Sequence, residues 1–165
     1  MKDMQGALSF YKDTKEIENT AFVCLGNTDR SDDAFGVQLA KKLKEFSVLR
    51  VYSEEEADPS TILLNLIEDE TIKKIVVIDA VDFNAEPGSI IVTSDISNAV
   101  RSVTTHNVPL HMWKQVIEEH GKEFVLLGSQ VKSIELFGEM SEEIKAKIDE
   151  IANLLDPTIC LKSCK

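Results

Sequence analysis

The stretch that decides the fold reads FVCLGNTDRSDDAFG, from Phe22 to Gly36. It opens within the apolar run 21–25, which is typical of a buried strand. Gly26-Asn27 then ends the strand, and Ser31 is a good N-cap for the helix that follows. Asp32 and Asp33 occupy the first turn of that helix, where the positive end of the helix dipole stabilises carboxylates. A strand, a glycine turn and an acidic helix start predict a ligand site at the carboxyl end of an α/β sheet.

The acidity of this turn limits the ligands that it can bind. A phosphate-binding loop uses glycines, backbone N–H groups and a lysine, and two aspartates would repel a phosphate. Carboxylates instead suit a cation, so the turn favours a metal over a phosphate group.

The whole chain has the composition of an ordinary globular protein. It has 165 residues, 43% of them hydrophobic and 28% charged, which fits one domain with a substantial core. The net charge of -11 argues against nucleic acid or an anionic membrane as a general partner. No apolar run approaches the ~20 residues that span a bilayer, and residues 1–20 lack the apolar core of a signal peptide. The three cysteines are an odd number and do not form a disulfide framework, so we expect the protein to reside in the reducing cytoplasm.

Strand-like and helix-like segments alternate along the chain. The clearest buried strand contains Ile75-Val76-Val77-Ile78, a run without polar alternation that is typical of a central parallel strand. Connections too long for hairpins predict a three-layer α/β/α sandwich with a mainly parallel sheet of about five strands. The short Pro87-Gly88 connection makes the strand at 89–93 the candidate for an antiparallel one. We expect strands at 21–25, 48–52, 74–79, 89–93 and 123–127, and helices at 32–46, 110–119 and 142–155, with a further short helix starting at 58–60.

These elements predict a single α/β domain over 21–156, preceded by an N-terminal extension at 1–20 and followed by a tail at 157–165. The last helix is expected to be capped by Ser141 and stopped by Pro157. In the extension, only a short helix near 11–18 is expected.

Three ionisable residues follow strand-like segments or stand at helix starts, namely Asp33, Asp79 and His106. If the sheet is parallel, their loops emerge at one edge and converge. Two carboxylates and one imidazole, with coordination positions left open, suit a divalent transition metal bound for a reaction. Each residue alone also has an ordinary explanation, as a helix start, a strand end or a loop histidine, so the hypothesis depends on their coincidence at one edge.

Other assignments of the same residues are weaker. An aspartate pair near the first strand and another aspartate ending the third resemble a phospho-receiver domain, but Gly128-Ser129-Gln130 stands where that family has a lysine. Cys24 lies inside a strand and is expected to be an inert buried thiol. Cys160 and Cys164 have a spacing that a metal site could use, although a plain reduced tail is the simpler interpretation.

Four motifs stand in order along the domain. They are Gly26-Asn27 with Asp32-Asp33-Ala34-Phe35-Gly36, then Asp79-Ala80-Val81-Asp82-Phe83 with Pro87-Gly88, then Thr104-Thr105-His106-Asn107-Val108-Pro109-Leu110, and the turn Gly128-Ser129-Gln130. Together they resemble the nickel–iron hydrogenase maturation endopeptidases over about 21–155. The third motif is most similar to the branch that processes the large subunit of formate-hydrogenlyase-type hydrogenases.

The resemblance implies an endopeptidase that removes a short C-terminal extension from a hydrogenase large-subunit precursor after nickel insertion. Carried over by motif, Asp33, Asp79 and His106 would be its metal-contacting and catalytic residues, with Asp32 supporting the site or the helix start. Nickel would arrive with the precursor, and no organic cofactor is implied. The alternative from another class is a nickel carrier or chaperone that uses the same three residues and leaves the mass of the precursor unchanged.

Overall fold

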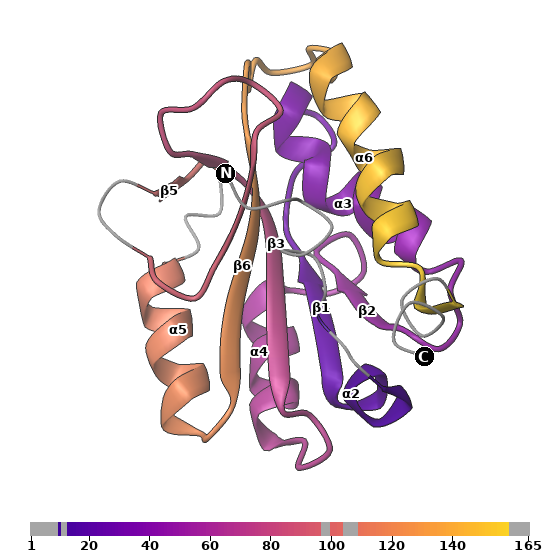
Figure 1. The fold of residues 1–165 in the computed structure, drawn as a ribbon. Coiled ribbons are helices and arrows are strands. Elements are labelled where there is room, and N and C mark those ends of the chain that lie inside the picture. Colours follow the sequence, from indigo (N-terminus) through magenta and orange to yellow (C-terminus); the bar gives the residue numbers. More distant parts are fainter. Residues whose placement is uncertain (1–9, 11–12, 97–99, 104–108, 159–165) are drawn as a thin grey trace.

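The computed structural model describes Phe10 and residues 13–96, 100–103 and 109–158, in which helices and strands alternate (Figure 1). The helices are α2 (Thr14–Asn19), the 3-10 helix η1 (Ser31–Ala34), α3 (Phe35–Leu43), α4 (Pro59–Glu68), α5 (Leu110–Glu119) and α6 (Glu142–Leu154). The strands are β1 (Thr20–Cys24), β2 (Arg50–Ser53), β3 (Lys74–Asp82), β4 (Ile90–Thr93), β5 (Arg101–Ser102) and β6 (Glu123–Gln130). None of the described helices is long and apolar enough to cross a membrane.

The strands form one mixed sheet in the order β2-β1-β3-β6-β4, with β5 paired to β3. The pairings among β1, β2, β3 and β6 are parallel, which confirms the predicted sheet. β4 runs antiparallel to β6, as its short connection predicts. The sheet has six strands rather than about five, because β5 adds an antiparallel pairing of two residues. A strand of two residues is too short to leave an apolar pattern in the sequence.

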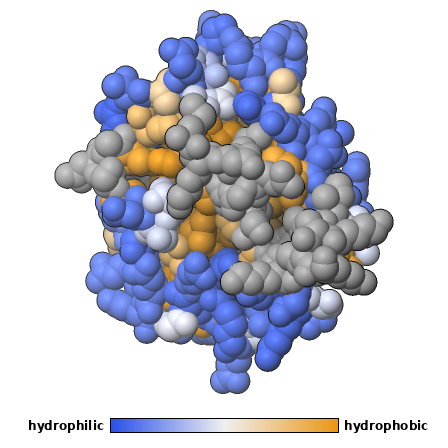
Figure 2. Space-filling view, in the orientation of Figure 1, coloured by the Kyte–Doolittle hydropathy of each residue, from blue (hydrophilic) through white to orange (hydrophobic). Residues whose placement is uncertain are grey.

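Helices cover both faces of the sheet, α3 and α6 on one and α4 and α5 on the other (Figure 1). Alternate residues of the central strands enter opposite cores. Val76 and Ile78 of β3 pack on the α3 and α6 side, whereas Ile75 and Val77 pack on the α4 and α5 side. Burial on both faces explains the unbroken apolar run of this strand. In Figure 2, apolar residues lie in the middle of the visible face and hydrophilic residues at its upper and lower ends.

Two serines do not act as the helix caps that the sequence predicts. Ser31 is the first residue of η1, with a φ of 52°, and its hydroxyl donates to the Glu135 carbonyl at 2.8 Å. Ser141 stands at the predicted N-cap position of α6, but its side chain makes no capping hydrogen bond, and its hydroxyl instead donates to Asp32 at 2.9 Å. In both cases a contact over more than a hundred residues replaces the local cap.

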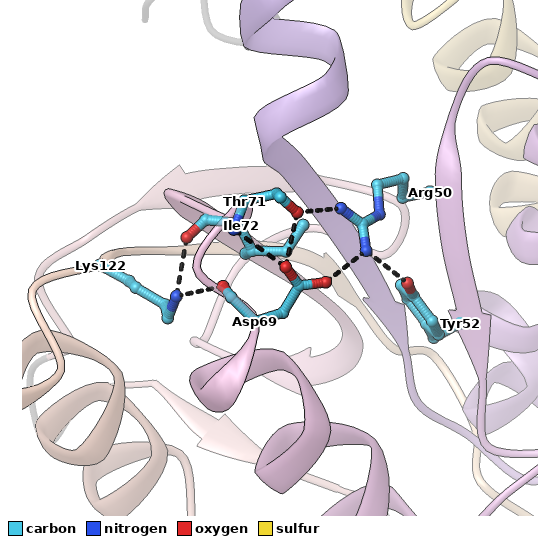
Figure 3. Close-up of polar contacts among 6 residues, drawn as sticks. All are labelled: Arg50, Tyr52, Asp69, Thr71, Ile72 and Lys122. Carbon is cyan, nitrogen blue, oxygen red and sulfur yellow. Dashed lines mark hydrogen bonds and ion pairs between the residues drawn. The ribbon is translucent and has the colours of Figure 1, made fainter.

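A polar network closes the amino-terminal edge of the sheet (Figure 3). Lys122, just before β6, is buried and donates to the carbonyls of Asp69 and Ile72, both at 2.8 Å. Arg50 of β2 donates to Thr71 Oγ1 at 2.8 Å and to Asp69 Oδ2 at 2.7 Å. Hydrogen bonds from Thr71, and then from Arg50, hold the pKa of Asp69 well below its usual range. These contacts fasten β2 and β6 to the turn that leads into β3.

Candidate functional site

The carboxyl ends of β1 and β3 bring two of the predicted site residues together. The strands are parallel neighbours, and Leu25, just beyond β1, donates its N–H to the Ile78 carbonyl at 2.8 Å. η1 follows this turn and packs against β3. It therefore carries Asp33 towards Asp79, which lies just beyond the end of β1 but within β3, since β3 runs to Asp82 and not to the predicted end at Asp79.

Two glycines permit this close approach. Gly26 has a φ of 151°, and a Cβ there would lie 2.2 Å from the carbonyl oxygen of Asp33. A Cβ on Gly36 of α3 would lie 2.1 Å from the Leu25 carbonyl oxygen and 2.9 Å from that of Ile78. Real Cβ atoms essentially never approach other atoms within 3.0 Å, so both positions exclude any side chain. Glycine is what lets η1 and α3 lie directly on the strand ends.

Asp33 and Asp79 are both fully buried, with 0% of each residue exposed. Burial raises the pKa of Asp79 well above its ordinary value, and the charges of Asp33 and Glu54 raise it further. Hydrogen bonds from Ser102 and from the Ala80 N–H oppose that shift in pKa. Buried carboxylates that repel one another in this way are costly unless a proton or a cation neutralises them. The surroundings of Asp79, with Asp33 nearby, therefore disfavour the charged form of its carboxyl.

A serine holds one oxygen of Asp79. Ser102 of β5 donates its hydroxyl to Oδ2 of Asp79 at 2.7 Å. The contact follows from the strand pairing, since Ser102 lies opposite Val81 of β3. The other oxygen, Oδ1, is buried and has no side-chain hydrogen-bond partner among the described residues. Oδ1 is thus the oxygen of Asp79 that Ser102 does not engage.

Asp32 is adjacent to Asp33 but is bonded to a different part of the chain. Its Oδ2 accepts from the N–H groups of Lys132 at 2.8 Å and Ser133 at 3.0 Å, and from the Ser141 hydroxyl at 2.9 Å. Its Oδ1 accepts from the Ser141 N–H at 2.7 Å. This buried carboxylate clamps the connection between β6 and α6 onto η1.

Comparison with known proteins places this fold in a family. A family model described as hydrogenase maturation protease matches residues 59–156. A relative from Methanocaldococcus jannaschii, assigned by its name to the hydrogenase maturation proteases, is 32% identical over 137 residues, which cover 79% of this chain and 89% of the relative. The chain belongs to the hydrogenase maturation protease family.

Further relatives agree with this assignment. The hydrogenase 3 maturation protease of Escherichia coli K12 is 26% identical over 140 residues, which cover 81% of this chain and 86% of that protein. The crystal structure of a [NiFe] hydrogenase maturation protease from Thermococcus kodakarensis matches with a TM-score of 0.70 and 29% identity, over 90% of this chain and 97% of the other. As a member of this family, the chain is a hydrolase that acts on peptide bonds.

The third predicted site residue of this protease, His106, lies outside the described residues, as do Cys160 and Cys164. In the part of the chain that the structure describes, no three His, Cys, Asp or Glu side chains gather closely enough to hold a metal. Asp33 and Asp79 are therefore the described members of the predicted triad.

Two residues of this edge, Glu54 and Ser102, are not among the residues singled out from the sequence. Glu54 directly follows β2, and its Oε2 accepts the Gly26 N–H at 2.8 Å. The strand-end rule that selects Asp79 applies equally to Glu54, so a signal for it existed in the sequence. Ser102 carries no such signal, since its part in the site depends on a pairing of two residues.

Other polar residues of the protease have structural or solvent-exposed positions. Gln130, in the last predicted motif, accepts the N–H groups of Phe83 at 2.8 Å and Ala85 at 3.2 Å, and so holds the turn after β3. Burial raises the pKa of the Cys24 thiol to about 12, which makes it an inert thiol. His111 and His120 are exposed.

Proposed function

We propose that this protease removes a C-terminal extension from the large-subunit precursor of a nickel–iron hydrogenase, and that it recognises nickel already bound to the precursor. Asp33, Asp79 and His106 are the proposed nickel-contacting and catalytic residues. The observation that carries the proposal is the buried pair of Asp33 and Asp79 at the carboxyl edge of the sheet, in a member of this family. Two mutually repelling carboxylates are the feature that a divalent cation from the substrate would neutralise.

His106 enters the proposal through its place in the sequence. It follows Ser102 by four residues, and Ser102 lies against Asp79. Four residues span at most about 14 Å of extended chain, so the His106 segment starts within reach of the two carboxylates. Two carboxylates and an imidazole are donors that divalent nickel accepts.

Recognition through nickel would make cleavage depend on the metal. The precursor supplies the ion with ligands of its own, and the protease supplies the remaining contacts. A precursor without nickel lacks this interaction, so discrimination arises from the missing contact. Water would be the nucleophile, and three roles suit these donors: the nickel would polarise the scissile carbonyl, the nickel would activate the attacking water, or one carboxylate would take the proton of that water as general base.

The test is to incubate the purified protease with a nickel-loaded large-subunit precursor and, separately, with the nickel-free form, and to weigh the products. We expect a short C-terminal peptide to be lost only from the loaded form. Asp33→Asn, Asp79→Asn and His106→Ala should abolish this cleavage. Asp29→Asn and His111→Ala, which alter exposed residues of the same types, should process at the rate of the wild type.

Two outcomes would count against the proposal. Equal cleavage of both forms would remove nickel from the recognition step. An unchanged mass of loaded precursors from several hydrogenase groups would overturn the substrate and leave the carrier hypothesis for the three residues.

A further inference from the structure

We propose that Ser102 is a positioning residue of this site, which orients Asp79 so that Oδ1 meets the nickel of the precursor. The inference rests on the proposed function, because it assigns a role within the same site. It concerns a residue of β5, outside the three residues that the motifs select.

The contact itself has the geometry of a strong hydrogen bond. The Ser102 hydroxyl lies 2.7 Å from Oδ2 of Asp79, within the short range of bonds to carboxylates. Because Asp79 is fully buried, water does not compete for this oxygen. Oδ1 has no side-chain partner among the described residues, so the serine leaves one defined oxygen for a ligand. A carboxylate fixed in this way acts as a monodentate ligand.

Contacts of three consecutive residues, 101–103, hold β5 and the residue after it against the end of β3. Ser102 pairs with Val81, and the Val103 N–H donates to the Ala80 carbonyl at 3.4 Å. Arg101 adds an exposed contact to Asp82 Oδ2 at 3.2 Å. The chain therefore leaves β5 towards His106 from a fixed point beside Asp79. The Ser102 side chain thus ties β5 to the strand that carries Asp79.

Removing such a donor has a characteristic cost. Groups that hydrogen-bond to a ligand of a metal typically contribute about 10- to 100-fold to metal affinity or activity. Ser102→Ala removes the hydroxyl and lets the Asp79 carboxylate rotate. Ser102→Thr keeps a hydroxyl at the same atom, and Ser102→Cys keeps a weaker donor.

The matched control is Ser129→Ala. Ser129 is a fully buried serine of β6, opposite Ala80 at the same edge of the sheet. Its hydroxyl makes no hydrogen bond to any described residue. The control therefore deletes a buried hydroxyl near the site without removing a bond to Asp79.

The experiment measures binding of Ni²⁺ alone to the protease by titration calorimetry, and kcat/KM for a nickel-loaded precursor. We expect Ser102→Ala to lower the nickel affinity and kcat/KM by about 10- to 100-fold. Ser102→Cys should give values between those of Ser102→Ala and the wild type. Ser102→Thr and Ser129→Ala should stay within about threefold of the wild type. Circular dichroism confirms that each variant is folded. Because calorimetry needs no turnover, it separates loss of the nickel contact from loss of catalysis.

Asp79→Asn in the same series separates the two proposals. If Asp79→Asn loses nickel binding and processing while Ser102→Ala matches Ser129→Ala, the role of Ser102 is overturned and the site stands. If Ser102→Thr fails to restore what Ser102→Ala loses, the hydroxyl is not the cause and the role is also overturned. If Asp79→Asn itself keeps both properties, the proposed site fails together with the inference.

Discussion

Asp32 and Asp33 are expected to respond differently to the same substitution. In the wild type, Oδ1 of Asp32 accepts the Ser141 N–H at 2.7 Å. Asp32→Asn leaves only one acceptor oxygen, and its new NH₂ group would face this N–H donor. A buried donor left without an acceptor costs about 1–3 kcal/mol. The three bonds to Oδ2 also lose the charge that makes such bonds roughly twice as strong as neutral ones. Together these terms predict a loss of about 3 kcal/mol of unfolding free energy.

Thermal and urea unfolding measure this loss. For a chain of this size, about 3 kcal/mol corresponds to a fall in Tm of about 6–12 °C. Asp29→Asn, an exposed aspartate of the same loop, is the control and should stay within about 0.5 kcal/mol of the wild type. Asp33→Asn should cost less stability than Asp32→Asn while abolishing processing, since its carboxylate is assigned to the substrate. An Asp32→Asn protein as stable as the Asp29→Asn control would refute the clamp.

Three further predictions test the electrostatics and the edges of the sheet. Asp79→Asn should raise the unfolding free energy at pH 7 by about 1 kcal/mol, because burial opposes ionisation of the carboxyl and the amide that replaces it does not ionise. Burial raises the pKa of Asp79 in the folded state, so the unfolding free energy of the wild type falls as pH rises above about 4. The difference in unfolding free energy between Asp79→Asn and the wild type, measured by urea titration, should therefore vanish near pH 3. Cys24 should resist iodoacetamide at pH 8 until urea unfolds the protein, as judged by mass spectrometry of its peptide, and labelling of the native protein would contradict its burial. Lys122→Met should lower the unfolding free energy by about 2 kcal/mol, since two carbonyl acceptors lose their donor, and Lys145→Met, at an exposed lysine, is the control.

The fold class could be predicted because it depends on patterns that lie within single segments. The apolar run 75–78 identifies a central strand, and the helix at 110–119 has the predicted bounds. The antiparallel direction of β4 followed from its short connection. Prediction failed where pairing over long distances forms the element. The two-residue β5 exists only because β3 is beside it, and η1 replaces the first turn of the predicted helix where the Asp32 carboxylate receives the distant 132–141 segment.

The same distinction between local patterns and long-range contacts applies to the candidate site. The strand-end rule needs only the order of the elements, and it correctly placed Asp33 and Asp79 at one edge, while the position of His106 stays a prediction. Which aspartate of the pair at 32–33 faces Asp79 is decided by η1, whose neighbours in space come from β3 and from the connection before α6. Which oxygen of Asp79 is hydrogen-bonded to a side chain is decided by Ser102. Local sequence rules therefore identify the edge of the sheet that carries the proposed site, whereas contacts between distant segments fix the position of individual atoms. Substitutions of Asp32 and Ser102 alter such contacts. They therefore test whether a buried polar residue holds the structure together or contributes to the proposed site.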